Sequence, residues 1–208
     1  MSTIWDKSLK ELRESTASDK PIATAGAVST LSATFGCALL VMVLEIQVAK
    51  INDQRKKRKA LLLLDELRNK MSQLSSYPDQ DITVFKTFIE SFNMPEKNRE
   101  QKDARVASIE NHRRSVIDTP MRAAISILET YPVITKMIDI TTGTLLADIA
   151  CGTQLMEASL QSLLWTVQVN TRDLEEKEMK NIQRERKRIG RSAREQSEKI
   201  LNLIKALT

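Results

Sequence analysis

The residues of this chain that could carry out chemistry are three carboxylates and one amide: Asp79, Asp81, Asp148 and Asn170. No phosphate-binding loop, nucleophile elbow or metal-ligand spacing accompanies them. Carboxylates can pair with a cationic substrate, orient a water molecule or accept a proton from it. We therefore expect any reaction here to be acid–base chemistry that needs no metal ion or other cofactor.

Asp79 and Asp81 have both a structural and a functional interpretation. Asp79 directly follows Pro78, where a helix N-cap is expected. Asp81 would then lie in the first turn of that helix, where the helix dipole favours an anion. The same geometry would keep both carboxylates ionised and able to orient water, so the sequence leaves both interpretations open.

Asp148 and Asn170 stand at the two ends of one apolar stretch. A buried carboxylate without a partner is costly, so Asp148 either lies near solvent in a first helical turn or is functional. Asn170 is either an ordinary helix-end residue or a residue that binds substrate. They lie 22 residues apart in the sequence, which corresponds to about 33 Å of helix. Both can therefore serve one small substrate only if a neighbouring subunit completes the site.

The composition indicates which elements hold these residues. The 208 residues include only five Gly and five Pro, and the helix formers Leu, Ala, Glu, Lys and Arg are all frequent. This predicts an all-α fold in one domain over residues 1–208, a bundle of long helices around two apolar central helices at about 24–50 and 145–170. The net charge of +5 permits an anionic ligand. Because the basic segments lack interleaved aromatic residues, we expect no nucleic-acid partner.

The first central stretch, residues 21–44, holds no charged residue and is long enough to cross a membrane. Its first half is rich in Ala, Gly, Ser and Thr, and Glu45 follows it directly, so we expect a buried helix and no membrane contact. The basic run at 55–59 is the feature that favours a span. Residues that share one helical face are expected to be buried: Val28, Leu31, Phe35, Leu39, Met42 and Ile46.

Proline and polar clusters are expected to separate the remaining helices. The pattern predicts a short helix at 3–16, a helix at 55–74 that stops at Pro78, and a helix from Asp79 to about residue 92. A polar helix at 98–118 should end before Pro120, a further break should fall at residues 131–132, and a long charged helix should occupy 173–207. Cys37 and Cys151 are expected to be buried free thiols.

The order of these features resembles the cyclodeaminase/cyclohydrolase family, which includes the cyclodeaminase half of formiminotransferase-cyclodeaminase and stand-alone methenyltetrahydrofolate cyclohydrolases. The similarity covers almost the whole chain, and it rests on order and spacing because each motif is short. The features that match are Pro21 with the Ala-rich helix after it, Asp79-Gln80-Asp81 with Phe85, Pro95 with Lys102 and Arg105, Pro120, Asp148, and Asn170-Thr171-Arg172-Asp173.

The resemblance implies a cytoplasmic homodimer and a hydrolase of folate one-carbon metabolism. It would be a methenyltetrahydrofolate cyclohydrolase or a formiminotetrahydrofolate cyclodeaminase, acting on a cyclic amidine C–N bond of a folate. The catalytic residues would be Asp79, Asp81 and Asp148. The substrate-binding residues would be Gly26, Lys102, Arg105 and Asn170. The anionic glutamate tail of the folate would be held either by the basic run at 55–59 or by Lys102 and Arg105.

The chain departs from the family at the loop before the central helix. The family typically has Pro-Gly-Gly-Gly-Ser there, whereas residues 23–27 read Ala-Thr-Ala-Gly-Ala. Consecutive glycines permit positive φ angles and close approach of the backbone to a ligand. The alternative hypothesis is therefore a catalytically inactive homologue that serves as a ligand-binding or scaffold protein. A third hypothesis is a basic, membrane-associated helical protein.

Overall fold

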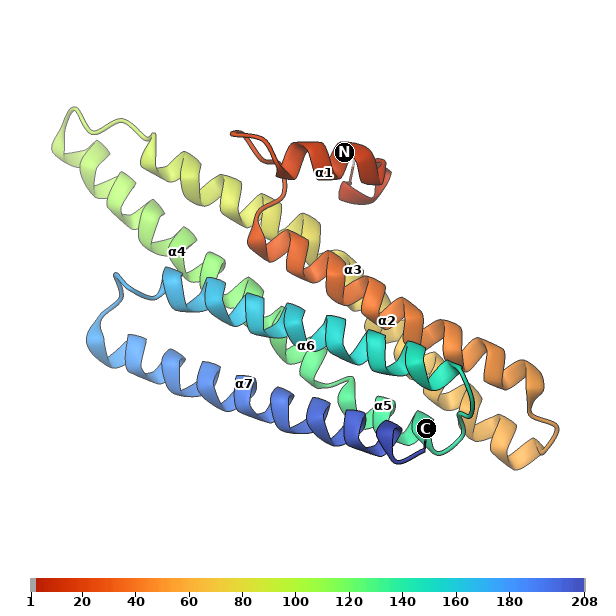
Figure 1. Cartoon of the computed structure of the whole chain (residues 1–208). Helices are drawn as coiled ribbons and strands as arrows, with labels where there is room; N and C mark the ends of the chain where they lie inside the picture. The colour runs from red at the N-terminus through yellow and green to blue at the C-terminus, as the bar shows by residue number, and fades with distance from the viewer. Residues whose placement is uncertain (1–2, 208) are drawn as a thin grey trace.

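Two apolar helices form the centre of the protein, α2 (Ala25–Lys50) and α6 (Leu145–Asn170). They run antiparallel in an elongated all-α bundle (Figure 1), whose computed structural model describes residues 3–207. Both predicted central helices and the all-α architecture are thus confirmed. The face of α6 that carries its large apolar residues is buried: Ile149, Met156, Leu160, Leu163 and Val167.

Two glycines let α2 and α6 touch through their backbones. A Cβ placed on Gly36 would lie 2.9 Å from the carbonyl oxygen of Gly152, and a Cβ on Gly152 would lie 2.8 Å from that of Gly36. Both distances are shorter than a carbon–oxygen contact allows. The close approach of the two central helices therefore depends on the absence of side chains at this crossing.

The other helices of the bundle pack on this pair and leave one of its faces uncovered (Figure 1). They are α3 (Gln54–Phe92), α4 (Arg99–Leu128), α5 (Tyr131–Ile138) and α7 (Glu176–Lys205). α3 packs on α2 and α4, α6 packs on α4 as well as α2, and α7 covers α6. Side-chain caps begin two of them: Asp53 accepts from the backbone N–H of Lys56 at 2.9 Å, and Asn98 from that of Gln101 at 2.8 Å.

The predicted helix ends at Pro78 and Pro120 are wrong. Both prolines lie inside continuous helices, α3 and α4, and both are buried. A proline removes one helical hydrogen bond and costs about 3 kcal/mol in a helix interior. Here the buried residues on both sides of each proline favour the continuous helix. Just before Pro78, the hydroxyls of Ser75 and Ser76 donate to the carbonyls of Met71 and Gln73 within the same helix.

The helix predicted at 3–16 is divided into two pieces. A 3-10 turn, η1 (Ile4–Asp6), precedes α1 (Leu9–Thr16). Each piece has its own capping box, in which Thr3 pairs with Asp6 and Ser8 with Glu11. Ser8 therefore begins a new helix where one amphipathic helix was expected.

One face of α2 is uncovered, which corrects the expectation that the face with Val28, Phe35 and Met42 is buried. Val28, Phe35 and Met42 are 37%, 49% and 38% exposed, because α2 lies at the side of the bundle with α3 and α6 as its main neighbours. Among residues 3–207, α2 is the one helix long and apolar enough to cross a membrane, with 67% of its most apolar window buried. A core helix of a soluble protein meets the same criterion.

The two cysteines lie in different surroundings. Cys37 is buried in the core, and burial raises the pKa of its thiol to about 12. Cys151 is exposed on α6, contrary to the prediction, because it lies on the side of α6 that no other helix covers. Both thiols are free, as expected.

Candidate functional site

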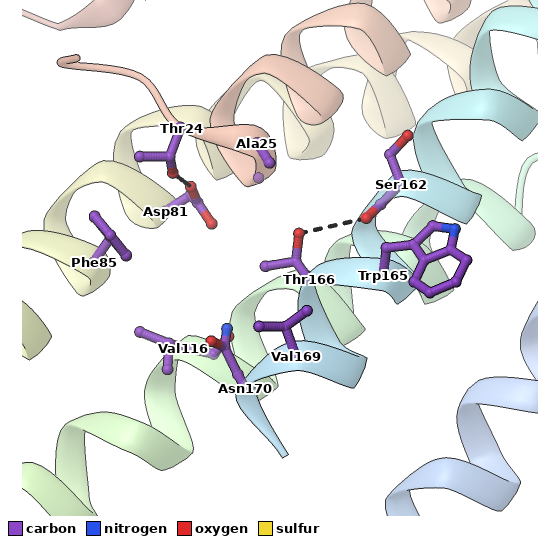
Figure 2. A pocket seen from close by; sticks show the side chains of 11 residues that line it. Thr24, Ala25, Asp81, Phe85, Val116, Ser162, Trp165, Thr166, Val169 and Asn170 are labelled. Carbon is purple, nitrogen blue, oxygen red and sulfur yellow. Dashed lines mark hydrogen bonds between the residues drawn. The ribbon is translucent and has the colours of Figure 1, made fainter. Parts of the chain in front are cut away.

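A cavity of ≈ 430 Å³ lies where the beginning of α2, the middle of α3 and the end of α6 meet, with α4 at one side. Figure 2 shows Thr24, Asp81 and Phe85 facing Ser162, Thr166 and Val169 across it. Its walls are mainly apolar, and Asp81 is the one ionisable residue among those that line it: Thr24, Ala25, Gly26, Asp81, Phe85, Val116, Ser162, Trp165, Thr166, Val169 and Asn170.

Asp81 reaches from α3 to the N-terminus of α2. It is 9% exposed and accepts hydrogen bonds from the Thr24 hydroxyl, at 3.3 Å, and from the backbone N–H of Ala27. Thr24, the N-cap of α2, makes no capping bond with its own side chain, so Asp81 supplies the cap from another helix. Burial raises the pKa of Asp81, and the bonds from Ala27 and Thr24 act in the opposite direction.

Gly26 makes room for this carboxylate. A Cβ on Gly26 would lie 2.1 Å from Asp81 Oδ1 and 2.7 Å from Oδ2. Gly26 is helical, and the one positive-φ residue within residues 3–207 is Gly143. The surviving glycine of the altered loop is therefore needed for the space it leaves and not for an unusual backbone conformation.

The α6 wall of the cavity carries polar groups at helical spacing. The amide nitrogen of Asn170 donates to the carbonyl of Val116 at 3.1 Å, which fixes the side chain and leaves its oxygen free of that bond. One and two turns earlier lie Thr166 and Ser162, and the Thr166 hydroxyl donates to the Ser162 carbonyl at 3.4 Å. Hydroxyl and amide groups thus face the Asp81 carboxylate across the cavity.

Asp79 and Asp148 do not line this cavity. Because α3 is continuous, Asp79 is not an N-cap, and two residues on a helix are turned by about 200°, so Asp79 and Asp81 point to different sides. Asp79 instead accepts from the backbone N–H of Ile4 at 2.8 Å. Asp148 is half-buried in the first turn of α6, at the other end of the helix from Asn170.

Lys102 and Arg105 also lie outside the cavity lining. Arg105 donates to the carbonyl of Phe92 at the end of α3 and pairs with Glu96 at 3.0 Å. It therefore closes the turn between α3 and α4, while Lys102 is exposed on α4. Of the seven residues singled out in the sequence, the structure gathers Gly26, Asp81 and Asn170.

Several lining residues were missed in the sequence. Phe85 was noted only as part of a motif, and it lies one turn after Asp81 with 41% of its side chain exposed. A signal for the α6 wall was present: Ser162, Thr166 and Asn170 recur every four residues and so share one face of the helix. Thr24 carried no such signal, since its role depends on Asp81, which is distant in sequence. Within residues 3–207, no three His, Cys, Asp or Glu side chains converge to hold a metal ion.

Comparison with known proteins relates this fold to one family. Residues 8–188 match a family model described as formiminotransferase-cyclodeaminase. The fold also matches the crystal structure of formiminotetrahydrofolate cyclodeaminase from Thermotoga maritima, with a TM-score of 0.84 and 16% identity over 98% of each chain.

Two longer relatives show the same relationship. The formimidoyltransferase-cyclodeaminase of Gallus gallus is 19% identical over 155 residues, which cover 74% of this chain and 29% of that protein. The protein of the same name from Sus scrofa is 20% identical over 162 residues, which cover 78% of this chain and 30% of that protein. The chain thus spans about three tenths of the length of each. Since the family model covers most of the chain, the protein belongs to the formiminotransferase-cyclodeaminase family.

Proposed function

We propose that this protein is an enzyme that acts on a cyclic amidine C–N bond of a folate one-carbon derivative. The observation that carries the proposal is a buried carboxylate, Asp81, as the one ionisable group lining a cavity with apolar and aromatic walls. A cavity of ≈ 430 Å³ lies in the usual size range of small-molecule sites. A planar cationic ring would pair with the carboxylate and place its faces against the apolar walls.

For a methenyl folate, the proposed reaction is hydrolysis. The methenyl carbon is cationic, and water adds to it while Asp81 accepts one proton of that water. The ring C–N bond then breaks as the added hydroxyl becomes the formyl C=O, and the proton of that hydroxyl passes to the ring nitrogen that keeps the electron pair. The formyl group remains on the other nitrogen, and Asp81 releases the proton it accepted to solvent. Because burial raises the pKa of Asp81, its carboxylate is a better proton acceptor than an exposed aspartate.

For a formimino folate, the same residue would work in the opposite sense. The second folate nitrogen attacks the formimino carbon, a new C–N bond forms, and the bond to the departing nitrogen breaks. The attacking nitrogen gives up its own proton to the departing nitrogen, and Asp81 in its protonated form donates a second proton. The departing nitrogen then leaves as ammonia, and the cationic methenyl folate remains. A raised pKa increases the protonated fraction of Asp81, so it supports this direction as well.

A turnover assay on both folates tests the proposal. We expect purified protein to change the methenyl absorbance faster than buffer alone, by its loss for hydrolysis or by its formation from formiminotetrahydrofolate for cyclisation. Absence of both changes, together with a thermal shift on adding folates, would instead support a ligand-binding homologue. Absence of turnover and of a thermal shift would support a scaffold.

The uncovered faces of α2 and α6 support a homodimer. Exposed or half-exposed residues recur at alternating steps of three and four on both helices, the spacing of a helix–helix seam. These stripes carry one charged residue, Asp148, at one end. Contiguous apolar surface of this kind usually marks an interface. The stripes consist of Ala25, Val28, Ser32, Phe35, Leu39, Met42 and Ile46 on α2, and of Asp148, Cys151, Leu155, Ala158, Ser162, Trp165 and Val169 on α6.

An antiparallel pairing of α6 with its copy would place Asp148 of the partner subunit beside the cavity that Asn170 lines. Mixed dimers test this: Asp81→Asn and Asp148→Asn homodimers are expected to be inactive, and mixing the two should restore activity in the heterodimer through its one intact site. Failure to regain activity in a verified heterodimer, or a monomer by light scattering, would contradict this arrangement. A cytoplasmic location and the absence of nucleic-acid partners remain predictions.

A further inference from the structure

The N-terminal arm, defined here as residues 3–16, is attached to the back of the candidate site. Figure 1 shows it as a separate short element beside the beginning of α2. Ile4 is 4% exposed and packs in a small apolar cluster that is distinct from the main core. The cluster joins the arm to the first turns of α2 and to α3: Ile4, Leu12, Ala23, Ala27, Leu31 and Ile82.

Two hydrogen bonds fasten the arm to α3 on either side of Pro78. The backbone N–H of Ile4 donates to Asp79 Oδ1 at 2.8 Å, and the indole N–H of Trp5 donates to the carbonyl of Ser75 at 2.8 Å. The Trp5 ring also lies edge-on to Phe35 of α2, with centroids 6.3 Å apart. The arm therefore bridges the two helices whose contact encloses Asp81.

The segments that hold the arm also form the site. The side chain of Ala27 packs in the apolar cluster with the arm, and its backbone N–H donates a hydrogen bond to Asp81. On α3, Asp79 and Ile82 contact the arm, while Asp81 between them faces the cavity. A movement of the arm would therefore change the position of the α2 N-terminus relative to the Asp81 carboxylate.

We propose that the arm positions Asp81, with Asp79 and Trp5 as positioning residues that contact no substrate. This inference rests on the proposed function only where it concerns turnover. The family match begins at residue 8, so Ile4 and Trp5 lie before the matching segment. The role of Asp79 would then be to accept a hydrogen bond, which an asparagine oxygen can also do.

The test compares Asp79→Ala with Asp79→Asn. Loss of the acceptor in Asp79→Ala should release η1, admit water to Asp81 and lower the pKa of its carboxyl toward the ordinary value. We expect kcat to fall ~10- to 100-fold through misplacement of the carboxylate. Asp79→Asn should retain both the wild-type pKa of Asp81 and wild-type kcat. The pKa is measured by carbon NMR of labelled aspartate carboxyls, which reports on Asp81 whether or not the protein turns over.

Trp5→Phe provides a second test that keeps the aromatic ring and removes only the N–H donor. It should shift the Asp81 titration in the same direction as Asp79→Ala. The control is Leu9→Ala in the same arm, at a side chain that is 71% exposed. Wild-type Asp81 titration in both Asp79→Ala and Trp5→Phe would overturn the inference, as would equal loss of kcat in Asp79→Asn and Asp79→Ala. A shifted titration in a protein without turnover would leave the inference intact and reject the proposed function.

Discussion

Replacing Asp81 by asparagine should abolish turnover without destabilising the protein. The substitution keeps an oxygen that can accept from Thr24 and Ala27 but removes the proton acceptor, so we expect kcat to fall ~10²- to 10⁴-fold. An Asp65→Asn variant, altered on an exposed part of α3, is the matched control and should retain full activity. Turnover by Asp81→Asn within threefold of the wild type would reject Asp81 as the catalytic group.

The pH dependence of stability provides a second readout for the same variant. Because the pKa of Asp81 is raised in the folded protein, folded protein binds more protons than unfolded protein above the ordinary value of 3.8. The free energy of unfolding therefore falls as the pH rises through the folded-state pKa of Asp81. Asp81→Asn has no carboxylate to ionise and does not show this fall. We expect equal Tm values near pH 4 and a Tm for Asp81→Asn at or above the wild type at pH 8. A lower Tm for the variant at pH 8 would contradict the raised pKa.

Replacing Gly26 by alanine should disrupt the fold and the site together. The new Cβ would stand 2.1 Å from Asp81 Oδ1 and 2.5 Å from its Cγ, so the carboxylate would have to leave the N-terminus of α2. We expect a loss of ~1–3 kcal/mol in the free energy of unfolding, typical of an overpacked interior, and loss of turnover. Chemical denaturation and the folate assay measure the two effects.

A double-mutant cycle identifies the cause of this destabilisation. Removing the carboxylate in Asp81→Ala should abolish most of the effect of Gly26→Ala, with a coupling energy of ~0.5–3 kcal/mol. Gly190→Ala is the matched control, since its Cβ would meet the ends of the Leu164 and Gln161 side chains at 3.1 and 3.3 Å, which can move. Additive effects of Gly26→Ala and Asp81→Ala would show that the glycine has another role.

The sequence predicted the parts of the fold that depend on composition. The helices at 24–50 and 145–170 were recognisable because each is a long apolar run with polar residues at both ends. The breaks at Pro78 and Pro120 were predicted wrongly because local preference was opposed by packing that no local pattern reveals. A helix interior tolerates proline when the residues around it are buried, as Leu74 and Tyr77 are before Pro78.

The error at Pro78 also limited the prediction of the site. With a helix start assumed there, Asp79 and Asp81 looked like a pair at one helix end, whereas in a continuous helix they face different partners. Asp81, Gly26 and Asn170 were each named as candidate site residues, and they line one cavity because three helices pack together. Lys102 and Arg105 were assigned by resemblance alone, and the turn that Arg105 closes could not be foreseen from residue types.

The backbone contact between Gly36 and Gly152 has a mechanical consequence for the cavity. It lies ten residues beyond Gly26 along α2, or about 15 Å, and neither helix can move closer at that point. While this contact is kept, the two central helices separate at the cavity end by rotating about it. A ligand thicker than the present gap would change the angle between α2 and α6, and the ends of both helices that lie far from the cavity would also move.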